Sequence, residues 1–297
     1  MEILTYSRIK ARKNCPMAEH LRYTKQLVSK FRKPSLDIGT AVHKGLETGS
    51  VEEALKALPE VFASTQAEAD KAETNKVLVE AMLLGYFSKY KPFDPEKTQN
   101  EIKFEIPIIN PKTKAASKSF CLQGKVDALT MIDGQYWLVE YKTAGQITGN
   151  YFERLEIDDQ ITSYIYALQR TLNIQIVGVI YRVIKKPHIK QTQKETLSKY
   201  HERLINDYQE RPEFYYFEGK FYRSQEDLAK FEKDLWYFTQ QLLYEKRQGI
   251  NTRNASRCVD FGTCTYFPIC TNQEDAELLF EIKAPHEELN ENESGGN

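Results

Sequence analysis

The 297-residue chain has no apolar run that approaches the roughly 18 residues of a membrane-spanning helix. Its first residues, MEILTYSRIK, lack the apolar core of a signal peptide, so we expect a cytoplasmic protein with no membrane partner. The formal net charge is only −1, which argues against a protein that coats nucleic acid nonspecifically but does not exclude a local basic groove. Hydrophobic residues make up 41% of the chain, enough for a sizeable core in one large or two small domains.

Although the net charge is small, the charges are segregated along the chain. Residues 8–33 contain nine Lys and Arg against one acid, Glu19, whereas residues 274–297 contain eight acids against one base, Lys283. A segregated basic arm is expected of a protein that binds a phosphate backbone, although a charge run is more often a solvated helix face. We expect the arm to bind DNA through Arg8, Lys10, Arg12, Lys13 and Arg22. Aromatic residues that could stack on bases are interleaved with it at Tyr6, Tyr23 and Phe31.

The stretch from Gly124 to Lys142, GKVDALTMIDGQYWLVEYK, predicts two β-strands joined by a tight turn. The turn is Asp133-Gly134, because Asp-Gly between apolar runs is a strong hairpin signal. Side chains alternate along a strand, so Glu140 and Lys142 share one face of the second strand. Asp127 on the first strand is then close enough to meet Glu140 across the ladder.

The convergence of Asp127, Glu140 and Lys142 predicts a metal site for phosphodiester hydrolysis. Mg²⁺ and Mn²⁺ prefer oxygen ligands and keep several waters, so two carboxylates can hold either ion. A neighbouring lysine can orient or help deprotonate a metal-bound water, and it can offset charge developing on a phosphate. Taken alone, the D-x12-E-x-K spacing is a weak pattern, and the alternative is a surface hairpin with one polar face.

The hydrophobic pattern predicts an α/β fold with a mixed central sheet flanked by helices. The predicted helical segments are 4–33, interrupted at Cys15-Pro16, then 36–47, 50–90, 151–172 and 226–246. The predicted strands are 101–109, 120–127, the second hairpin strand and 175–184. We expect one domain over residues 1–283, divided into a helical N-terminal segment (residues 1–95), a core (residues 96–200) and a C-terminal helix with a cysteine cluster (residues 201–283). The acidic residues 284–297 are expected to form a disordered tail.

Three further side chains are candidates for the same site. Gln160 and Tyr164 lie four residues apart in a predicted helix and therefore project from one face. That face either looks onto the hairpin carboxylates or packs into the core. His43 could complete a His/Asp/Glu metal site, although a lone helix histidine is more often structural.

The five cysteines favour a metal centre over disulfides. Cys258, Cys264 and Cys270 fall within CVDFGTCTYFPIC, and Cys15 lies near the N-terminus. In a chain without a secretion signal, four such thiolates suit Zn²⁺ or an iron–sulfur cluster better than disulfides, and free thiols in a loop are the alternative. A centre of this kind would tie the C-terminus to the N-terminal helix and would be structural. Cys121 is most simply a small buried residue.

In their order along the chain, these positions resemble the PD-(D/E)XK nuclease superfamily, and within it the RecB-like exonuclease branch that carries a 4Fe–4S cluster. That branch includes helicase-associated nucleases of bacterial recombination, CRISPR-adaptation exonucleases and many phage exonucleases. The matching segments are LTYSRIKARKNCPMAEHLRY, IGTAVHKGLE with His43, GKVDAL with Asp127, VEYKT with Glu140 and Lys142, DQITSYIYAL with Gln160 and Tyr164, and the terminal cysteines. Two departures are Val126 in place of proline and a C-x5-C-x5-C spacing in place of C-x2-C-x5-C, which keeps zinc as an alternative.

The resemblance implies a restriction-endonuclease-like core with a metal-dependent DNA exonuclease activity on single strands or DNA ends, in recombination and repair or in phage DNA processing. It implies that His43, Asp127 and Glu140 hold Mg²⁺ or Mn²⁺ and that Lys142 activates the attacking water. It also implies that Gln160 and Tyr164 position the strand. The residues implied for the 4Fe–4S cluster are Cys15, Cys258, Cys264 and Cys270.

Two other functions are compatible with these residues. One is a structure-specific endonuclease that acts on flaps or nicks, and the other is a DNA-binding module whose nuclease fold is inert. Inert members of such families usually lose the lysine or a carboxylate, whereas Asp127, Glu140 and Lys142 are all present. The chain has no G-x-x-x-x-G-K-S/T motif, so any unwinding would come from a partner such as a helicase or recombinase.

Overall fold

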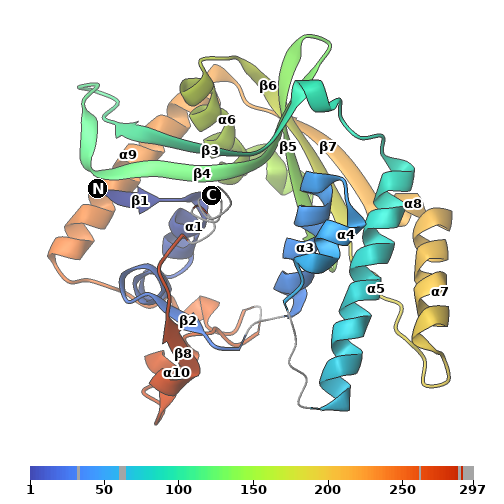
Figure 1. Ribbon diagram of the computed structural model, residues 1–297. Helices are drawn as coiled ribbons and strands as arrows, with labels where there is room; N and C mark the ends of the chain where they lie inside the picture. The colour runs from blue at the N-terminus through green and yellow to red at the C-terminus, as the bar shows by residue number, and fades with distance from the viewer. Residues whose placement is uncertain (32–33, 60–64, 261, 287–288, 290–297) are drawn as a thin grey trace, which may run out of the picture.

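The computed structural model describes residues 1–31, 34–59, 65–260, 262–286 and 289 (Figure 1). The α-helices are α1 Tyr6–Asn14, α2 Pro16–Glu19, α3 Pro34–Thr48, α4 Val51–Lys56, α5 Gln66–Lys89, α6 Asp159–Leu172, α7 Leu197–Glu210, α8 Pro212–Tyr215, α9 Gln225–Arg247 and α10 Phe267–Cys270. The strands are β1 Glu2–Leu4, β2 Leu27–Ser29, β3 Thr98–Ile109, β4 Ala116–Ile132, β5 Gln135–Ala144, β6 Ile176–Lys185, β7 Tyr216–Tyr222 and β8 Phe280–Ile282. A π-helix covers His20–Thr24, and short 3₁₀-helices cover Pro95–Lys97, Glu153–Ile157, Ala255–Arg257 and Ala276–Leu279. Within these described segments no helix is both long and apolar enough to cross a membrane.

A six-stranded mixed sheet forms the centre of the fold, in the order β1-β4-β5-β6-β7, with β3 paired to β4 as well. β4 is the long strand that organises it. Along one edge β4 pairs antiparallel with β3, and along the other it pairs first with β1, in parallel, and then with β5, antiparallel. β6 lies parallel to β5, and β7 lies antiparallel to β6. The predicted α/β class with a mixed sheet is therefore confirmed.

The hairpin that joins β4 to β5 has the predicted turn. Asp133 has φ of 52° and Gly134 has φ of 78°, so both central residues are left-handed, as a type I′ turn requires. The register pairs Ile132 with Gln135 and continues to Ala128 with Val139. This register brings Asp127 to the same level as Glu140.

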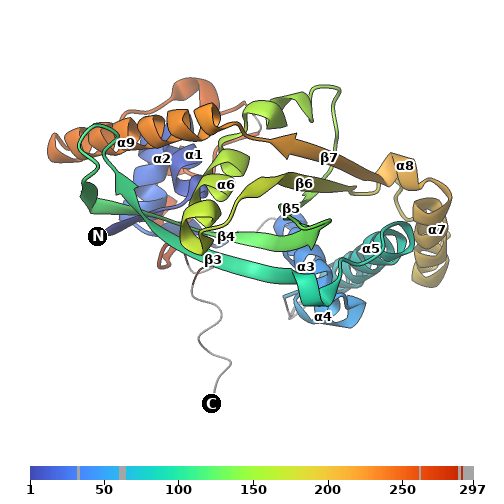
Figure 2. The same cartoon turned by 90° about the horizontal axis from the view of Figure 1, so that it is seen from above.

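Helices cover both faces of the sheet and create two hydrophobic clusters (Figure 2). On one face, α6 and α9 pack over residues such as Leu138 and Val179. On the other face, α3, α4, α5 and α7 pack over Val139 and Tyr141. Because neighbouring residues of β5 belong to different clusters, both faces of this central strand are buried. Any polar side chain on it must therefore find a partner or a ligand.

The N-terminal region differs from the prediction of continuous helix over residues 4–33. The segment contains α1, α2 and the π-helix, but Leu27–Ser29 forms β2, which pairs antiparallel with β8 at Phe280–Ile282. The backbone N–H of Lys30 also donates to the carbonyl of Leu279 at 3.0 Å. The helical prediction was wrong there because the pairing partner lies about 250 residues away and leaves no local periodicity.

The sheet also extends past the core that the sequence predicts. β7, at residues 216–222, pairs with β6 over seven residue pairs, so a core ending at residue 200 is too short. Gly219 lies in the middle of β7, and an internal glycine weakens the strand signal in a sequence. The predicted helical region 50–90 divides into α4 and α5, and the predicted tail, 284–297, lies mostly outside the described residues.

The packing of α5 against the β7 side of the sheet gives a test of the fold. A Cβ added at Gly85 would collide with the hydroxyl of Tyr216 and lie 2.8 Å from Cβ of Tyr208. The Tyr216 hydroxyl donates to the carbonyl of Met82 at 2.9 Å, so it is not free to move. Gly85→Ala should therefore lower the free energy of unfolding by about 1–3 kcal/mol, as overpacking does.

Chemical denaturation measures this effect, with Ser88→Ala as the matched control. Ser88 is exposed on the same helix, and helix propensity alone favours alanine at both positions. The control should keep or slightly raise stability. A Gly85→Ala protein more stable than wild type would contradict the packing described.

Candidate active site

The site lies at a fork in the sheet. β1 pairs with β4 only as far as Leu4 with Leu122, and the pairing of β5 with β4 ends at Ala128 with Val139. The same edge of β4 therefore has no strand partner over residues 123–127 among the described strands. The Oδ2 atom of Asp127 accepts a hydrogen bond from the backbone N–H of Tyr141 at 2.8 Å. The carboxylate thus satisfies a backbone donor that the diverging strands leave without a partner.

On the other side of β4, the partner strand is distorted at the same level. Asn100 pairs with Ala128 and Ile102 with Val126, so Glu101 lies opposite Asp127 and has a left-handed φ of 54°. A residue other than glycine adopts this conformation at a cost of roughly 1 kcal/mol or more. Nδ2 of Asn100 donates to the carbonyl of Glu47 at 2.7 Å, which holds the end of α3 against this distorted segment.

Glu140 is the most buried acid of the site, with 3% of its surface exposed. Its Oε1 atom accepts hydrogen bonds from Nζ of Lys142 and, at 3.1 Å, from Nε2 of Gln160. Nε2 of Gln160 also donates to the hydroxyl of Tyr164 at 2.9 Å. The other carboxylate oxygen, Oε2, is buried without a hydrogen-bond partner among the described residues.

The first turn of α6 positions Gln160. The predicted helix over 151–172 begins only at Asp159, because the side chain of Asp158 accepts hydrogen bonds from the backbone N–H groups of Gln160 and Ile161 and caps the helix. Tyr164 follows one turn later, and its ring packs edge-to-face on Phe104 with centroids 5.9 Å apart. Gln160 and Tyr164 therefore do face the carboxylates, as the functional interpretation of their spacing predicted.

His43 reaches the fork from α3, on the opposite face of the sheet. Its Nδ1 atom lies 3.4 Å from Oδ1 of Asp127. One turn earlier, Gly39 faces Thr143 of β5, and a Cβ added there would lie 3.4 Å from Oγ1 of Thr143, so α3 packs against this strand. Helix α3 thus brings the imidazole to the aspartate.

Burial and mutual charge shift the titration of these groups. Burial raises the pKa of Glu140 to about 7, Lys142 opposes this shift, and the negative charge of Asp127 adds to it. Burial also acts on Asp127, but His43, Lys142 and the N–H of Tyr141 outweigh it and lower the pKa. The pKa of Lys142 is raised, because attraction to Glu140 and Asp127 exceeds the effect of burial. Lys142 is therefore a cation at neutral pH.

The arrangement fits a hard divalent cation held by few protein ligands. Among the described residues, no three His, Cys, Asp or Glu side chains lie close enough to one another to form a metal-binding group. Mg²⁺, however, usually takes one or two carboxylates and keeps its waters. Asp127 and Glu140 supply such oxygens, and Oε2 of Glu140 is buried with no partner in the described ranges. His43 is adjacent to Asp127 but does not complete a three-ligand group as placed.

The basic arm is largely structural, contrary to the predicted role of Arg8 and Arg12. Both arginines are buried and share the carboxylate of Glu19, at 2.8 Å from Nε of Arg8 and 3.2 Å from Nη1 of Arg12. Arg8 also pairs with Glu2, and Arg12 with Glu245 of α9. These buried ion pairs fix α1 in place and leave neither guanidinium for DNA.

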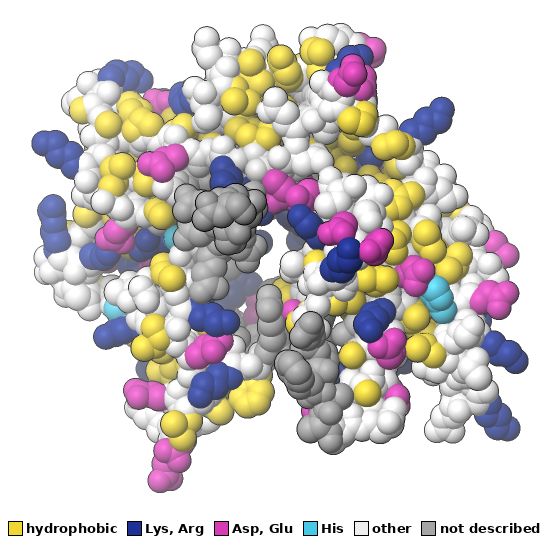
Figure 3. All heavy atoms as spheres, in the orientation of Figure 1, with side chains coloured by type: hydrophobic (Ala, Val, Ile, Leu, Met, Phe, Trp, Pro, Cys, Tyr) yellow, Lys and Arg dark blue, Asp and Glu magenta, His cyan; other side chains and the backbone are white. Residues whose placement is uncertain are grey.

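The other predicted DNA contacts have mixed environments. Lys10 is exposed, Lys13 is exposed but pairs with Asp159 at 2.6 Å, and Arg22 is half-buried over the ring of Tyr23. Figure 3 shows basic and acidic side chains interspersed over the face drawn, with no single basic patch among the described residues on it. Of the five predicted DNA contacts, Arg8 and Arg12 are therefore buried in ion pairs, whereas Lys10 is exposed.

The four cysteines of the predicted cluster gather in one region of the fold. The backbone N–H of Met17 donates to the carbonyl of Thr252 at 3.0 Å, which brings the C-terminal segment onto the start of α2. Burial raises the pKa of the Cys270 thiol, and the nearby thiols of Cys15, Cys264 and Cys258 raise it further. As placed, the thiols do not form a metal-binding group among the described residues.

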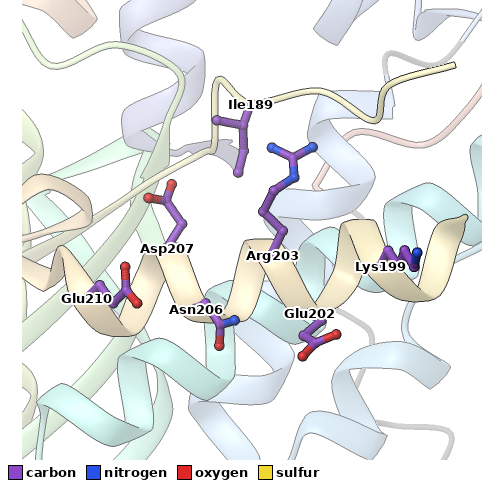
Figure 4. A pocket seen from close by; sticks show the side chains of 7 residues that line it. All are labelled: Ile189, Lys199, Glu202, Arg203, Asn206, Asp207 and Glu210. Carbon is purple, nitrogen blue, oxygen red and sulfur yellow. The ribbon is translucent and has the colours of Figure 1, made fainter. Parts of the chain in front are cut away.

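A hollow of about 470 Å³ lies along α7 (Figure 4). Its lining is Ile189, Lys199, Glu202, Arg203, Asn206, Asp207 and Glu210. Arg203 pairs with Glu195, and Asp207 pairs with Arg211, so two of the charged side chains that line the hollow already have partners. The hollow contains none of the side chains at the fork.

Comparison with known proteins gives the same class as the fold and the fork. The sequence profile of the PD-(D/E)XK nuclease superfamily matches residues 3–271, and the chain therefore belongs to this superfamily. No curated protein matches the chain.

The chain also matches solved structures, two of which cover most of its length. A crystal structure from Eubacterium rectale, of a protein named "Putative exonuclease", is 12% identical, has a TM-score of 0.52 and covers 99% of this chain and 94% of that chain. At this identity the likeness shows the fold alone. The structure of the protein SSO0001 is 11% identical and covers 91% of this chain and 95% of that one. Its TM-score is only 0.30, which is too low to show a shared fold.

Proposed function

We propose that the chain is a divalent-metal-dependent deoxyribonuclease that digests DNA from its ends and prefers single strands. The observation that carries the proposal is the convergence of Asp127, Glu140 and Lys142 at the fork, with Gln160 donating to Glu140 at 3.1 Å. Two acids that can hold a divalent cation, together with a lysine that can offset charge on a phosphate, are suited to metal-assisted hydrolysis of a phosphodiester. A structural ion pair alone would not leave one oxygen of a buried carboxylate without a partner among the described residues.

Asp127 and Glu140 would hold Mg²⁺ or Mn²⁺, with His43 as a further ligand. When bound, the cation would polarise the phosphate and activate a water molecule. The charge of His43 and Lys142 already keeps Asp127 ionised, as a metal ligand must be. Oε2 of Glu140 would be the second oxygen that binds the cation. A cation bound there would remove the cost of leaving a buried oxygen without a partner.

Lys142, Gln160 and Tyr164 would act on the substrate and the attacking water. Because its pKa is raised, Lys142 remains protonated and would offset the negative charge that develops on the phosphate. Gln160 holds Glu140 and Tyr164 in fixed positions through its amide. Tyr164 also keeps its proton, since burial raises its pKa, so it is a hydrogen-bond donor for the strand.

The exonuclease mode is the more specific element of the proposal. It is supported by the resemblance of the motifs to the RecB-like branch and by the fold shared with the protein named "Putative exonuclease". A role in recombination and repair or in phage DNA processing follows from the same resemblance, with a helicase or recombinase as the partner that would open a duplex. A structure-specific endonuclease is the second candidate, because the same fork would serve it.

Degradation of end-labelled single- and double-stranded DNA, with and without Mg²⁺ or Mn²⁺, tests the nuclease. Lys142→Ala and Asp127→Ala should each lower the rate by about 10²-fold or more, since each removes charge stabilisation or a metal ligand. Lys230→Ala is the control, because Lys230 is an exposed α9 residue that pairs only with Asp234 among the described residues. Metal-independent digestion, or full activity in Lys142→Ala, would contradict the proposal, and release of internal fragments first would favour the endonuclease.

We further propose that Cys15, Cys258, Cys264 and Cys270 hold a 4Fe–4S cluster, with Zn²⁺ as the alternative. The support is that residues from both ends of the chain converge there and that the thiols raise the pKa of Cys270 together with burial. Removal of such a centre would release the C-terminal segment from α2 rather than alter the chemistry at the fork.

Metal analysis of anaerobically purified protein tests this centre. A brown protein with about four iron atoms per chain is expected, and a colourless protein with one zinc would establish the alternative. Cys270→Ser should abolish binding of iron or zinc at the cysteine centre. Cys121→Ser, at a cysteine in β4, should not affect it. Protein without iron or zinc would overturn the centre.

A further inference from the structure

The first helix rises directly out of the fork. β1 makes its last pair with β4 at Leu4, opposite Leu122, and α1 begins two residues later at Tyr6. Because β1 and β5 share one edge of β4, the start of α1 lies at the mouth of the gap that holds Asp127. Tyr6 is thus an aromatic residue at the entrance to the proposed catalytic site.

Buried contacts hold α1 rigidly in this position. The side chain of Thr5 accepts a hydrogen bond from the backbone N–H of Arg8 at 3.2 Å and caps the helix. Farther along, the buried pairs of Arg8 and Arg12 with Glu19 anchor its inner face. The outer face is tied to α6 by Lys13. A residue at the start of such a helix is preorganised for binding.

The contact between α1 and α6 links Tyr6 to the catalytic side chains. Lys13 pairs with Asp159 at 2.6 Å, and Asp159 directly precedes Gln160, which donates to Glu140. Burial raises the pKa of the Tyr6 hydroxyl, the nearby charges of Asp158 and Asp159 add to the shift, and those of Lys142 and Arg154 oppose it. Tyr6 therefore lies within electrostatic range of Lys142 itself.

The ring of Tyr6 is half-buried, and Nζ of Lys10 lies over it at 5.7 Å from the centroid. A base that stacks on this face would take the place of the ammonium group, which would then be free to contact a phosphate. The hydroxyl of Tyr6 makes no hydrogen bond within the described segments of the chain. The other aromatic residues of the arm are placed differently. Tyr23 is packed between Arg8, Arg22 and His286, and Phe31 lies beyond β2, far along the chain from the fork.

We propose that Tyr6 is a stacking platform for an unpaired base next to the scissile phosphate, with Lys10 beside it for the neighbouring phosphate. This inference rests on the nuclease function proposed above and adds the residue that would contact the unpaired strand where it enters the site. Stacking on an aromatic ring needs a free base face, which every unpaired base offers regardless of sequence, whereas phosphate contacts only position the strand. The site would therefore distinguish single-stranded from double-stranded DNA, and it would not distinguish one sequence from another.

Binding of a single-stranded oligonucleotide with 2-aminopurine near its end tests the inference, measured without divalent metal so that no cleavage occurs. Stacking on Tyr6 should quench the 2-aminopurine fluorescence. Tyr6→Phe should bind and quench like wild type, because the hydroxyl has no partner among the described residues. Tyr6→Leu keeps the bulk of the side chain but loses the ring, so affinity should fall by about 5- to 100-fold and the quenching should disappear.

Kinetics and a matched control complete the experiment. With metal added, Tyr6→Leu should raise KM by a similar factor while kcat changes little, since the residue binds the strand and does not contact the reacting atoms. Tyr237→Leu, on the exposed face of α9, should leave affinity, quenching and kinetics unchanged. Equal affinity and quenching in Tyr6→Leu and wild type would overturn the stacking site, as would a loss in Tyr6→Phe equal to that in Tyr6→Leu.

The two proposals fail in different ways. If wild-type protein binds and quenches the oligonucleotide but never cleaves DNA, the nuclease is wrong and the stacking site stands as a binding site. If it cleaves single strands and Tyr6→Leu is unaffected in binding, the nuclease stands and the stacking site is wrong. Thermal melting of each variant confirms that the observed losses are not losses of fold.

Discussion

The divergence of two strands on one edge of β4 is the constraint on which the rest of the structure depends. Strand β1 covers the edge as far as Leu122 and β5 covers it from Ala128, and the gap between them exposes backbone groups in the middle of a buried sheet. Asp127 fills the gap in part by accepting the N–H of Tyr141. The hydrogen bond from the backbone N–H of Tyr141 holds this carboxylate in a fixed position and orientation. The other groups of the site are arranged around it.

Charge accounts for the composition of the site. The buried Glu140 and the half-buried Asp127 would repel each other. His43 and Lys142 reduce that repulsion without removing the need for a further ligand at Glu140. Charge has the opposite use in the N-terminal arm. There the buried Arg8 and Arg12 pair with the buried Glu19, and these ion pairs hold α1 with its outer face toward solvent.

Local sequence rules predicted the hairpin geometry at the fork, and they missed the long-range pairing. The Asp-Gly turn and strand alternation placed Asp127, Glu140 and Lys142 side by side, because these features depend on residues within one hairpin. The spacing of Gln160 and Tyr164 left two orientations open, and in the structure Gln160 donates to Glu140. The partners of the arm could not be predicted, since Glu245 lies 233 residues from Arg12 and no local pattern links them. The pairing of β2 with β8 escaped for the same reason. The metal roles and the cysteine centre remain predictions.

The central claim is that the fork holds a divalent cation, and direct measurement of Mn²⁺ binding by electron paramagnetic resonance tests it most directly. Catalysis is not needed for the readout. Wild-type protein should bind Mn²⁺, and Glu140→Gln, which keeps the hydrogen-bonding shape but removes the charge, should weaken binding by at least about tenfold. Glu52→Gln, at an exposed acid of α4, should bind like wild type. Equal Mn²⁺ affinity in Glu140→Gln and wild type would contradict the account.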